Sequence, residues 1–324
     1  MTNNPRKSMP RLWLAVLLLV GVSTTLSTVA VAGGERLLPV QYGSKQVVCD
    51  EIRQRYAINQ RQLNAPILNL LFLDAAERGC KQLVLEFLEK GAAVGTRDRF
   101  GNTALLKAAR LGENDVVDLL LSVDADIHHQ NLAGSTALLQ AATMSRRRTL
   151  AMLLEHGAAV NIANRRGVTP LLAAAYNGNE RILELLLAAG ADPKPLDATG
   201  KSALVYAAAR GFPRVVLRLL RAGVDANTRH DHSLTALMWA AGHTNDVPVT
   251  EGLATVRLLL EHDAGVNLVD DRGRTALMIA AERGHAEVVA ALLAAGADAT
   301  VRDAEGKTAL DLASDDTISR MLLR

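Results

Sequence analysis

The amino-acid sequence predicts an all-α solenoid of stacked helix-turn-helix units with hairpin-like connecting turns, and three observations carry this prediction. The stretch from Asp271 to Arg302 reads DRGRTALMIAAERGHAEVVAALLAAGADATVR, and its skeleton recurs along the chain. The copies begin at intervals of 33 residues, with one interval of 40. Each copy holds two apolar stretches with helical spacing, and a single copy cannot bury its apolar face alone. Neighbouring copies must therefore stack into one elongated domain.

Local signals mark where the helices of each copy begin and end. In every copy from Asp98 onward a hydroxyl residue stands at the start of the first helix, where it can accept a hydrogen bond from a free backbone N–H group. These residues are Thr103, Thr136, Thr169, Ser202, Thr235, Thr275 and Thr308. The first helices are expected to end at left-handed glycines, namely Gly79, Gly112, Gly178, Gly211 and Gly284. Asp124 and Asp263 replace the glycine that ends the second helix, and Asp tolerates that conformation better than most residues.

The period and the residues of the copies resemble the ankyrin repeat family over roughly Pro66 to the C-terminus. The T-P-L-H start of that family is only partly kept. Other residues replace its histidine, at Leu106, Leu139, Leu172, Val205, Met238, Met278 and Asp311, and only Thr169-Pro170 keeps the proline. The resemblance implies a non-catalytic scaffold that binds proteins through hairpin tips and the inner helices of its concave face.

The predicted organisation has three parts. Residues 1–32 form a signal peptide, 33–65 an N-terminal extension with one helix, and 66–324 the ankyrin repeat domain. Within that domain we expect an N-terminal cap at 66–97 and a partial C-terminal repeat at 303–324, since terminal copies of a solenoid close its exposed ends. The six repeats between them start at Asp98, Asn131, Asn164, Asp197, His230 and Asp270.

The first 32 residues have the pattern of an export signal. Three cations precede the apolar run LWLAVLLLVGV, and Ala30-Val31-Ala32 offers small residues for cleavage before Gly33. The alternative is an uncleaved membrane anchor, for which the run is short beside the roughly 20 residues of a spanning helix. Cleavage would remove Arg6, Lys7 and Arg11 and no acid, and would change the formal net charge from +2 to −1. We therefore expect a protein of the bacterial periplasm that is no general polyanion binder.

The two cysteines of the chain, Cys49 and Cys80, would both reach this oxidising compartment. Cys49 lies in a predicted helix ahead of the repeats, and Cys80 follows Gly79 in the N-terminal cap. A disulfide between them would hold that helix over the end of the solenoid and add about 2 to 4 kcal/mol. The alternative is two buried thiols, because spacing alone does not establish geometry.

No catalytic motif stands out in the sequence. It contains no Gly-rich phosphate loop, Cys-x-x-Cys pair, His-Glu-x-x-His helix or Gly-x-Ser-x-Gly elbow. Both histidine clusters, His128-His129 and His230-Asp231-His232, fall in predicted turns, and the second could ligate a transition metal only with further ligands. We expect no enzyme activity, no metal and no cofactor. A metal-binding or enzymatic periplasmic protein is the alternative.

The repeat that starts at His230 departs from the others. Ser233 stands for its turn glycine and Thr244 for its helix-ending glycine, and seven residues are added within GHTNDVPVTEGLAT. The addition falls between its two helices, where a solenoid places surface loops. Such a loop could carry function or be neutral, since loops lengthen at little cost.

The exposed variable positions of the family place a basic surface on the hairpin tips and inner helix ends. The partner-binding residues that we predict are Arg99, Phe100, Arg110, Arg165, Arg166, Tyr176, Lys201, Arg210, Arg229, Trp239, Arg272, Arg274, Arg283 and Arg302. Trp239 could instead fill space beside Met238, and long basic side chains can simply cover their neighbours. Guanidinium groups suit carboxylates, and Arg and aromatic residues are enriched at interface centres. We expect a monomer that binds an acidic protein and neither nucleic acid nor, after cleavage, a membrane. A secreted effector that binds host proteins is a further alternative.

Overall fold

The computed structural model describes residues 45–59, 64–244 and 246–323. The predicted signal peptide lies outside the described residues. Within them the regular structure is helical, from α1 to α17, with one short 3-10 turn, η3 (Asp231–Ser233). This confirms the predicted all-α class. Among the helices so described, none is long and apolar enough to cross a membrane.

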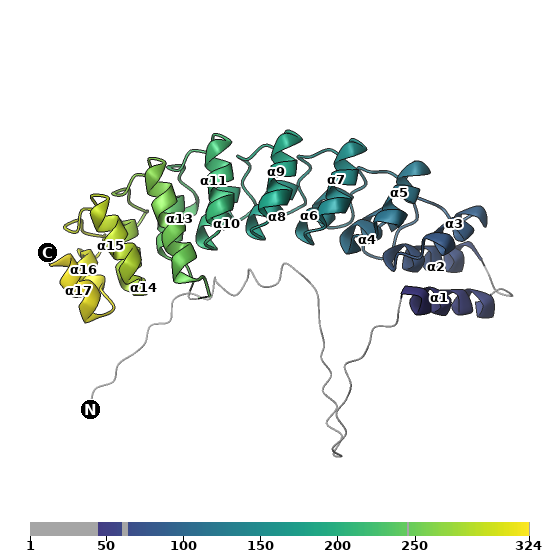
Figure 1. The fold of residues 1–324 in the computed structure, drawn as a ribbon, viewed down its shortest axis with the longest axis horizontal. Helices are drawn as coiled ribbons and strands as arrows, with labels where there is room; N and C mark the ends of the chain where they lie inside the picture. Colours follow the sequence, from purple (N-terminus) through teal and green to yellow (C-terminus); the bar gives the residue numbers. More distant parts are fainter. Residues whose placement is uncertain (1–44, 60–63, 245, 324) are drawn as a thin grey trace, which may run out of the picture. The chain divides into compact units, whose positions relative to one another are not determined.

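The helices of residues 43–324, which form one compact unit, stack in two layers (Figure 1). Each even-numbered helix contacts the next even-numbered one, and the odd-numbered helices from α3 onward form the second layer. The inner layer consists of α2 (Ala65–Glu77), α4 (Ala104–Leu111), α6 (Ala137–Thr143), α8 (Pro170–Tyr176), α10 (Ala203–Ala209), α12 (Ala236–Ala241), α14 (Ala276–Arg283) and α16 (Ala309–Leu312). The outer layer consists of α3 (Lys81–Glu89), α5 (Asn114–Ser122), α7 (Arg147–Glu155), α9 (Glu180–Ala188), α11 (Pro213–Arg221), α13 (Val249–Glu261), α15 (Ala286–Ala294) and α17 (Asp316–Leu322).

The core runs continuously between the two layers. In each repeat a pair of alanines on the inner helix, such as Ala108 and Ala109 of α4, is fully buried. Their small side chains let the next inner helix approach closely. Larger side chains from the outer helix, such as Val116, Val117 and Leu120 of α5, fill the remaining space. Buried area therefore grows with each added repeat, and this burial is the main favourable contribution to folding.

The predicted helix starts are all present. The Thr103 side chain accepts a hydrogen bond from the Leu106 N–H at 3.4 Å, and the equivalent bond forms in every later copy. Asp124 and Asp263 adopt the left-handed conformation, as expected, with φ of 57° and 61°. Ser145 adopts it as well, with φ of 56°, at a helix end that the sequence had not marked.

Gly178, which follows α8, shows why glycine is needed at such an end. Its φ is +67°, and a Cβ atom there would lie 2.8 Å from the ring of Phe212. Phe212 stands just before α11 in the next repeat and covers the glycine. Both the left-handed backbone conformation and the packing against Phe212 therefore require glycine at this position.

The connecting hairpins share one hydrogen-bond pattern. The Asp98 carboxylate accepts the N–H groups of Phe100 and Asn102 at 2.8 and 2.9 Å. The same two bonds form at Asn131, Asn164, Asp197, Asp270 and Asp303. Neighbouring hairpins are also joined by a backbone bond, such as Leu132 N–H to Phe100 C=O at 3.0 Å.

The fifth repeat breaks this pattern. His230 has no carboxylate to organise the turn, and both His232 and Ser233 take left-handed φ values near 58°. Among the seven hairpins of the described chain, from Asp98 to Lys307, a backbone bond joins each neighbouring pair except the fourth and the fifth. No such bond joins Thr199 of the fourth hairpin to Asp231 of the fifth. The hairpin side of this junction therefore lacks the backbone hydrogen bond of the others, and the Ser202 hydroxyl contacts the His230 ring across it.

The seven added residues of the fifth repeat do not form a loop alone. α13 has 13 residues, whereas α11 has 9, so four of the additions extend the outer helix. The apolar spacing of VTEGLATVRLLLE continues the helical period upstream, which explains the extension. The expectation of a simple surface loop was therefore wrong in part.

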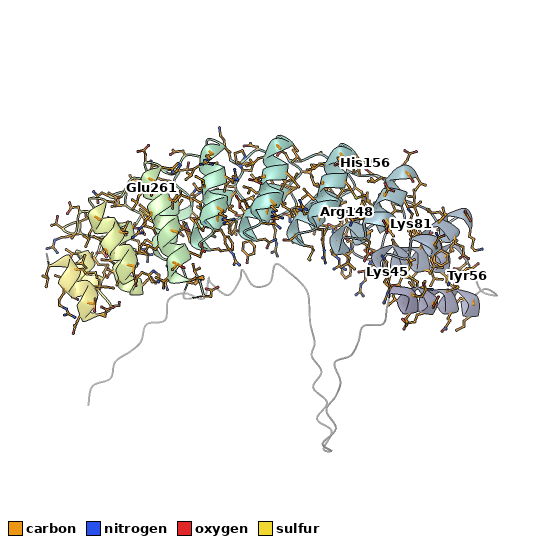
Figure 2. The ribbon with its side chains drawn as sticks, in the orientation of Figure 1. Lys45, Tyr56, Lys81, Arg148, His156 and Glu261 are labelled. Carbon is orange, nitrogen blue, oxygen red and sulfur yellow. A yellow bond between two sulfur atoms is a disulfide. The ribbon has the colours of Figure 1, made fainter. Side chains whose placement is uncertain are left out.

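α1 (Lys45–Asn59) packs against the N-terminal cap. A disulfide joins Cys49 to Cys80, with the two Cα atoms 5.6 Å apart. Ile52 and Tyr56 of α1 are buried, and the ring centroid of Tyr56 lies 5.4 Å from that of Phe87 in the cap. Figure 2 shows Tyr56 and Lys45 on this helix. α1 thus covers the end of the solenoid that would otherwise expose apolar side chains.

Candidate functional site

The candidate site is the exposed side of the inner layer. The fourth residue of each full inner helix lies in one row from repeat to repeat, which we call the inner row: Lys107, Gln140, Ala173, Tyr206, Trp239 and Ile279. Ala173 is buried and the others are partly exposed. In the middle of this row two large aromatic side chains follow one another.

Six side chains of the third to fifth repeats form what we call the ring–cation cluster: Tyr176, Lys201, Tyr206, Arg210, Phe212 and Trp239. The Arg210 guanidinium lies 4.5 Å from the Tyr176 ring centroid and 5.5 Å from that of Phe212. The Tyr176 and Tyr206 rings meet edge to face at 5.4 Å. The Lys201 ammonium lies 5.5 Å from the Trp239 ring centroid. Both cations are therefore held against aromatic rings rather than free in solvent.

A buried carboxylate fixes the centre of this cluster. The Tyr206 hydroxyl donates a short hydrogen bond to Asp197, whose other carboxylate oxygen accepts the N–H groups of Thr199 and Lys201. Burial raises the pKa of the Tyr206 hydroxyl far above its usual value, and the bond to Asp197 raises it further. Tyr206 therefore remains a neutral donor with a fixed orientation.

The predicted binding residues of the first repeat are partly neutralised within the chain. Arg110 pairs with Glu77 of the N-terminal cap at 2.5 Å, and Lys107 pairs with the other oxygen of the same carboxylate at 2.6 Å. Because Glu77 lies in the preceding copy, the list of variable positions gave no sign of this pairing. Arg110 offers less positive charge to a partner than its exposure suggests.

Arg274 is not exposed as the sequence analysis expected. It is only 8% exposed, and its guanidinium is paired with Glu282 of α14. The backbone N–H of Arg274 is bonded to Asp270, which holds the residue beneath its hairpin so that the side chain lies along the inner helix. Arg274 is therefore held in an ion pair within its own repeat.

The hairpin tips of the first three repeats are basic and apolar together. Arg99 lies 4.7 Å over the ring of Phe100, which is 56% exposed. Leu132, at the neighbouring tip, is 59% exposed and was missed by the sequence analysis, although it occupies the position of Arg99 one period later. Arg165 and Arg166 at the third tip are exposed.

The C-terminal arginines are less available. Arg229 donates a hydrogen bond to the Val269 carbonyl and Arg302 donates one to the Gly306 carbonyl. Arg272 is exposed but lies 4.0 Å from the Asp270 carboxylate. Arg283 is exposed at the end of α14. The predicted basic surface therefore concentrates in the third and fourth repeats.

The turn histidines have structural surroundings. The buried His129 ring contacts the Gly101 carbonyl at 2.8 Å, and the buried His230 ring contacts the Ser202 hydroxyl at 3.2 Å. Elsewhere, His243 and His285 stack with ring centroids 4.0 Å apart. No group of three or more His, Cys, Asp or Glu side chains that could hold a metal is present in the described part of the chain.

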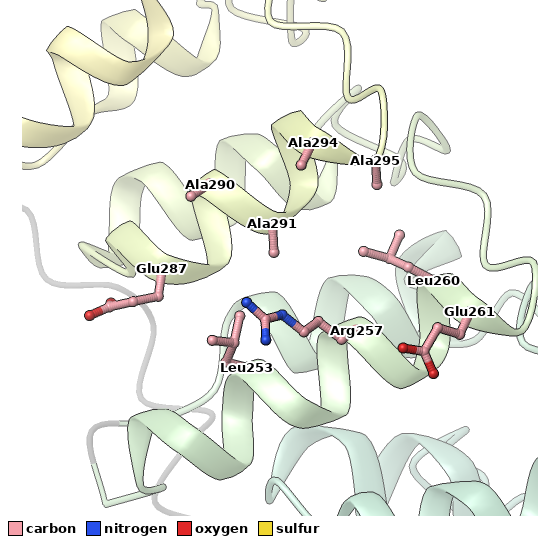
Figure 3. Close-up of a pocket in the computed structure, with 9 residues that line it drawn as sticks. All are labelled: Leu253, Arg257, Leu260, Glu261, Glu287, Ala290, Ala291, Ala294 and Ala295. Carbon is pink, nitrogen blue, oxygen red and sulfur yellow. The ribbon is translucent and has the colours of Figure 1, made fainter.

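A groove of about 510 Å³ lies in the outer layer, between α13 and α15 (Figure 3). Leu253 and Leu260 line one side, and the alanines at 290, 291, 294 and 295 line the other. Arg257 extends from α13 into the space between the two helices (Figure 3). The groove faces away from the ring–cation cluster, and its lining is mainly small and apolar.

Stacked helix pairs with an exposed inner row define a repeat scaffold for protein–protein interaction. Comparison with known families agrees: models of ankyrin repeats in three copies match residues 71–164, 113–197 and 171–249, a single-repeat model matches 232–271, and a many-copy model matches 259–313. The chain belongs to the ankyrin repeat family, whose members are generally non-enzymatic scaffolds.

Two curated relatives share part of this array. The chain is 51% identical over 53 residues to ankyrin repeat domain-containing protein 63 of Homo sapiens, and equally to that of Mus musculus. The match covers 16% of this chain and 14% of each relative. The likeness is therefore one between repeats and does not extend over either whole protein.

Proposed function

We propose that this chain is an exported, non-catalytic scaffold of the bacterial periplasm that binds an acidic protein partner. The binding surface consists of the inner row and hairpin tips of the third and fourth repeats. The chain acts by holding its partner, since this surface exposes arginine and aromatic side chains, which are typical of protein interfaces.

One observation carries this proposal. Arg165, Arg166 and Arg210 are exposed in neighbouring repeats, and none of them forms an ion pair within the described residues. Lys107 and Arg110 of the first repeat, and Arg274, already have carboxylate partners in the chain. Positive charge left unpaired at one place attracts a partner of opposite charge and speeds its association.

Export is supported by two independent features. The leader has a basic start, an apolar core and small residues before Gly33. The Cys49–Cys80 disulfide is of the kind that persists in oxidising compartments. A partner in the same compartment would meet the scaffold without nucleic acid as a competitor.

The test reverses the three arginines to glutamate together and measures capture of partners from periplasmic extract. A matched control reverses Arg148, Arg181 and Arg214, which are exposed on the outer helices of the second, third and fourth repeats. We expect the inner reversal to weaken capture strongly and the outer reversal to leave it nearly unchanged, with the helical signal intact in both. Capture should also weaken as salt rises, because screening shortens the range of the attraction. Equal capture by both variants at every salt concentration would contradict the proposal.

A further inference from the structure

Each cation of the ring–cation cluster lies over one face of an aromatic ring. Arg210 covers Tyr176 and contacts Phe212, and Lys201 lies over Trp239. A guanidinium that lies against a ring directs its N–H groups outward along its edges, where they can bond a carboxylate at two points. The cluster therefore presents hydrogen-bond donors to solvent more than it presents ring faces.

We propose that the ring–cation cluster binds an extended acidic segment of the partner through two carboxylates, one at Arg210 and one at Lys201. This inference rests on the proposed function and specifies the chemistry that its surface recognises.

The two cations lie at opposite ends of α10 and lean toward different repeats. Lys201 stands just before Ser202, the residue that caps the start of α10, and its ammonium lies over Trp239 of the fifth repeat. Arg210 caps the end of α10, and its guanidinium lies over Tyr176 of the third repeat. An extended segment that crosses the inner layer can thus meet the two cations with two separate carboxylates.

The cations are held in place before any partner arrives. Contacts with Tyr176 and Phe212 restrict the Arg210 side chain, and the Lys201 ammonium also donates a 3.1 Å hydrogen bond to the Thr199 hydroxyl. A long basic side chain that is already ordered loses less entropy on binding. The aromatic neighbours therefore raise affinity without contacting the ligand through their faces.

The same arrangement disfavours ligands that bind by stacking. A sugar ring or a nucleobase needs an open aromatic face, and those of Tyr176 and Trp239 are covered on one side by the cations. The Tyr206 hydroxyl proton is donated to Asp197 and cannot also be donated to a ligand. Carboxylates suit the donors that remain.

The experiment uses the chain from Gly33 onward, the proposed mature form, in which Trp239 is the only tryptophan. Blocked peptides of serine and threonine carry two glutamates, one glutamate and one glutamine, or two glutamines at the same two positions. Trp239 fluorescence and the anisotropy of labelled peptide measure Kd at low salt. We expect the peptide with two glutamates to bind at least about tenfold tighter than the peptide with two glutamines and several-fold tighter than the peptide with one glutamate.

Variants assign the effect to the cluster. Arg210→Gln should abolish the preference for glutamate over glutamine, while Arg210→Lys should keep part of it, since the charge remains and the fork is lost. Arg214→Gln is the matched control, an arginine of the same repeat whose side chain is 85% exposed on the outer helix, and should change nothing. Equal binding of the glutamate and glutamine peptides, no gain from the second glutamate, or tighter binding of oligothymidylate or a chitooligosaccharide would each overturn the inference.

This outcome can be separated from that of the proposed function. If the peptides bind without preference but capture of the partner still depends on Arg165 and Arg166, the basic surface is correct and the carboxylate site at α10 is wrong. If capture ignores the reversal of all three arginines, the proposed function itself fails.

Discussion

Replacing Gly178 by alanine tests the packing between the third and fourth repeats. The residue has φ of +67°, where an L-residue costs about 1 to 2 kcal/mol more than glycine. The new Cβ would also lie 2.8 Å from the Phe212 ring, which must shift in a packed interface at a cost of about 1 to 3 kcal/mol. We therefore expect Gly178→Ala to lower the free energy of unfolding by about 2 to 5 kcal/mol.

The same repeat offers a matched control. Gly190 has φ of +84°, but nothing lies within 4 Å of the Cβ that alanine would add there. Gly190→Ala should therefore cost only the backbone part, about 1 to 2 kcal/mol. Urea unfolding followed by far-UV circular dichroism measures both variants under identical conditions, and the difference between them isolates the contact with Phe212.

A double-mutant cycle completes the test. In a Phe212→Ala background the clash is absent, so Gly178→Ala should cost no more than Gly190→Ala does. If Gly178→Ala and Gly190→Ala destabilise the protein equally when Phe212 is present, the reasoning from the ring contact is refuted.

Three further predictions concern the N-terminal region and two histidines whose pKa is lowered. Cys80→Ser should lower stability by about 2 to 4 kcal/mol, and reductant should do the same to the natural chain but not to the variant; two freely alkylated thiols would contradict this. The exported protein should begin at Gly33 by N-terminal sequencing of the periplasmic fraction, whereas an intact leader in the membrane fraction would contradict cleavage. Burial lowers the pKa of His230 and of His285 below the ordinary 6.5, so the unfolded chain binds more protons below that pH. Stability should therefore fall as pH drops below about 6.5, and His285→Gln should flatten the profile; a profile unchanged by that variant would argue against the assignment.

Features set within one repeat were predictable from the sequence. Thr136 caps α6 because its hydroxyl reaches an N–H group three residues along the chain. Such capping signals depend on residues close by in the sequence. They recur in each 33-residue copy, so together they fix where each helix begins. The length of α13 was misjudged because an insertion can extend a helix as well as a loop.

Features that join repeats were harder to predict. Tyr176, Lys201, Arg210 and Trp239 were each identified from the sequence, but the cluster that they form with Tyr206 and Phe212 was not. Side-chain direction and length decide which groups meet across a repeat boundary, and periodicity contains neither. Phe212 could have been found by one signal: it follows Gly211 directly, in the position whose side chain covers the helix-ending glycine one period earlier.

Arg274 illustrates the opposite error. The equivalent position is partly exposed in most copies, but Arg274 is buried, because Glu282 of the same repeat offers a carboxylate within reach. The family pattern describes the backbone, whereas exposure depends on the charges that each copy places nearby.

The missing backbone bond between Thr199 and Asp231 has a mechanical consequence. Each repeat touches only its neighbours, so compliance in the array is set junction by junction. At the fourth–fifth junction the hairpins meet through the side chains of Ser202 and His230 in place of that backbone bond. Lys201 belongs to one side of that junction and Trp239 to the other. The contact between these two side chains therefore spans a junction that is held by side-chain contacts and helix packing.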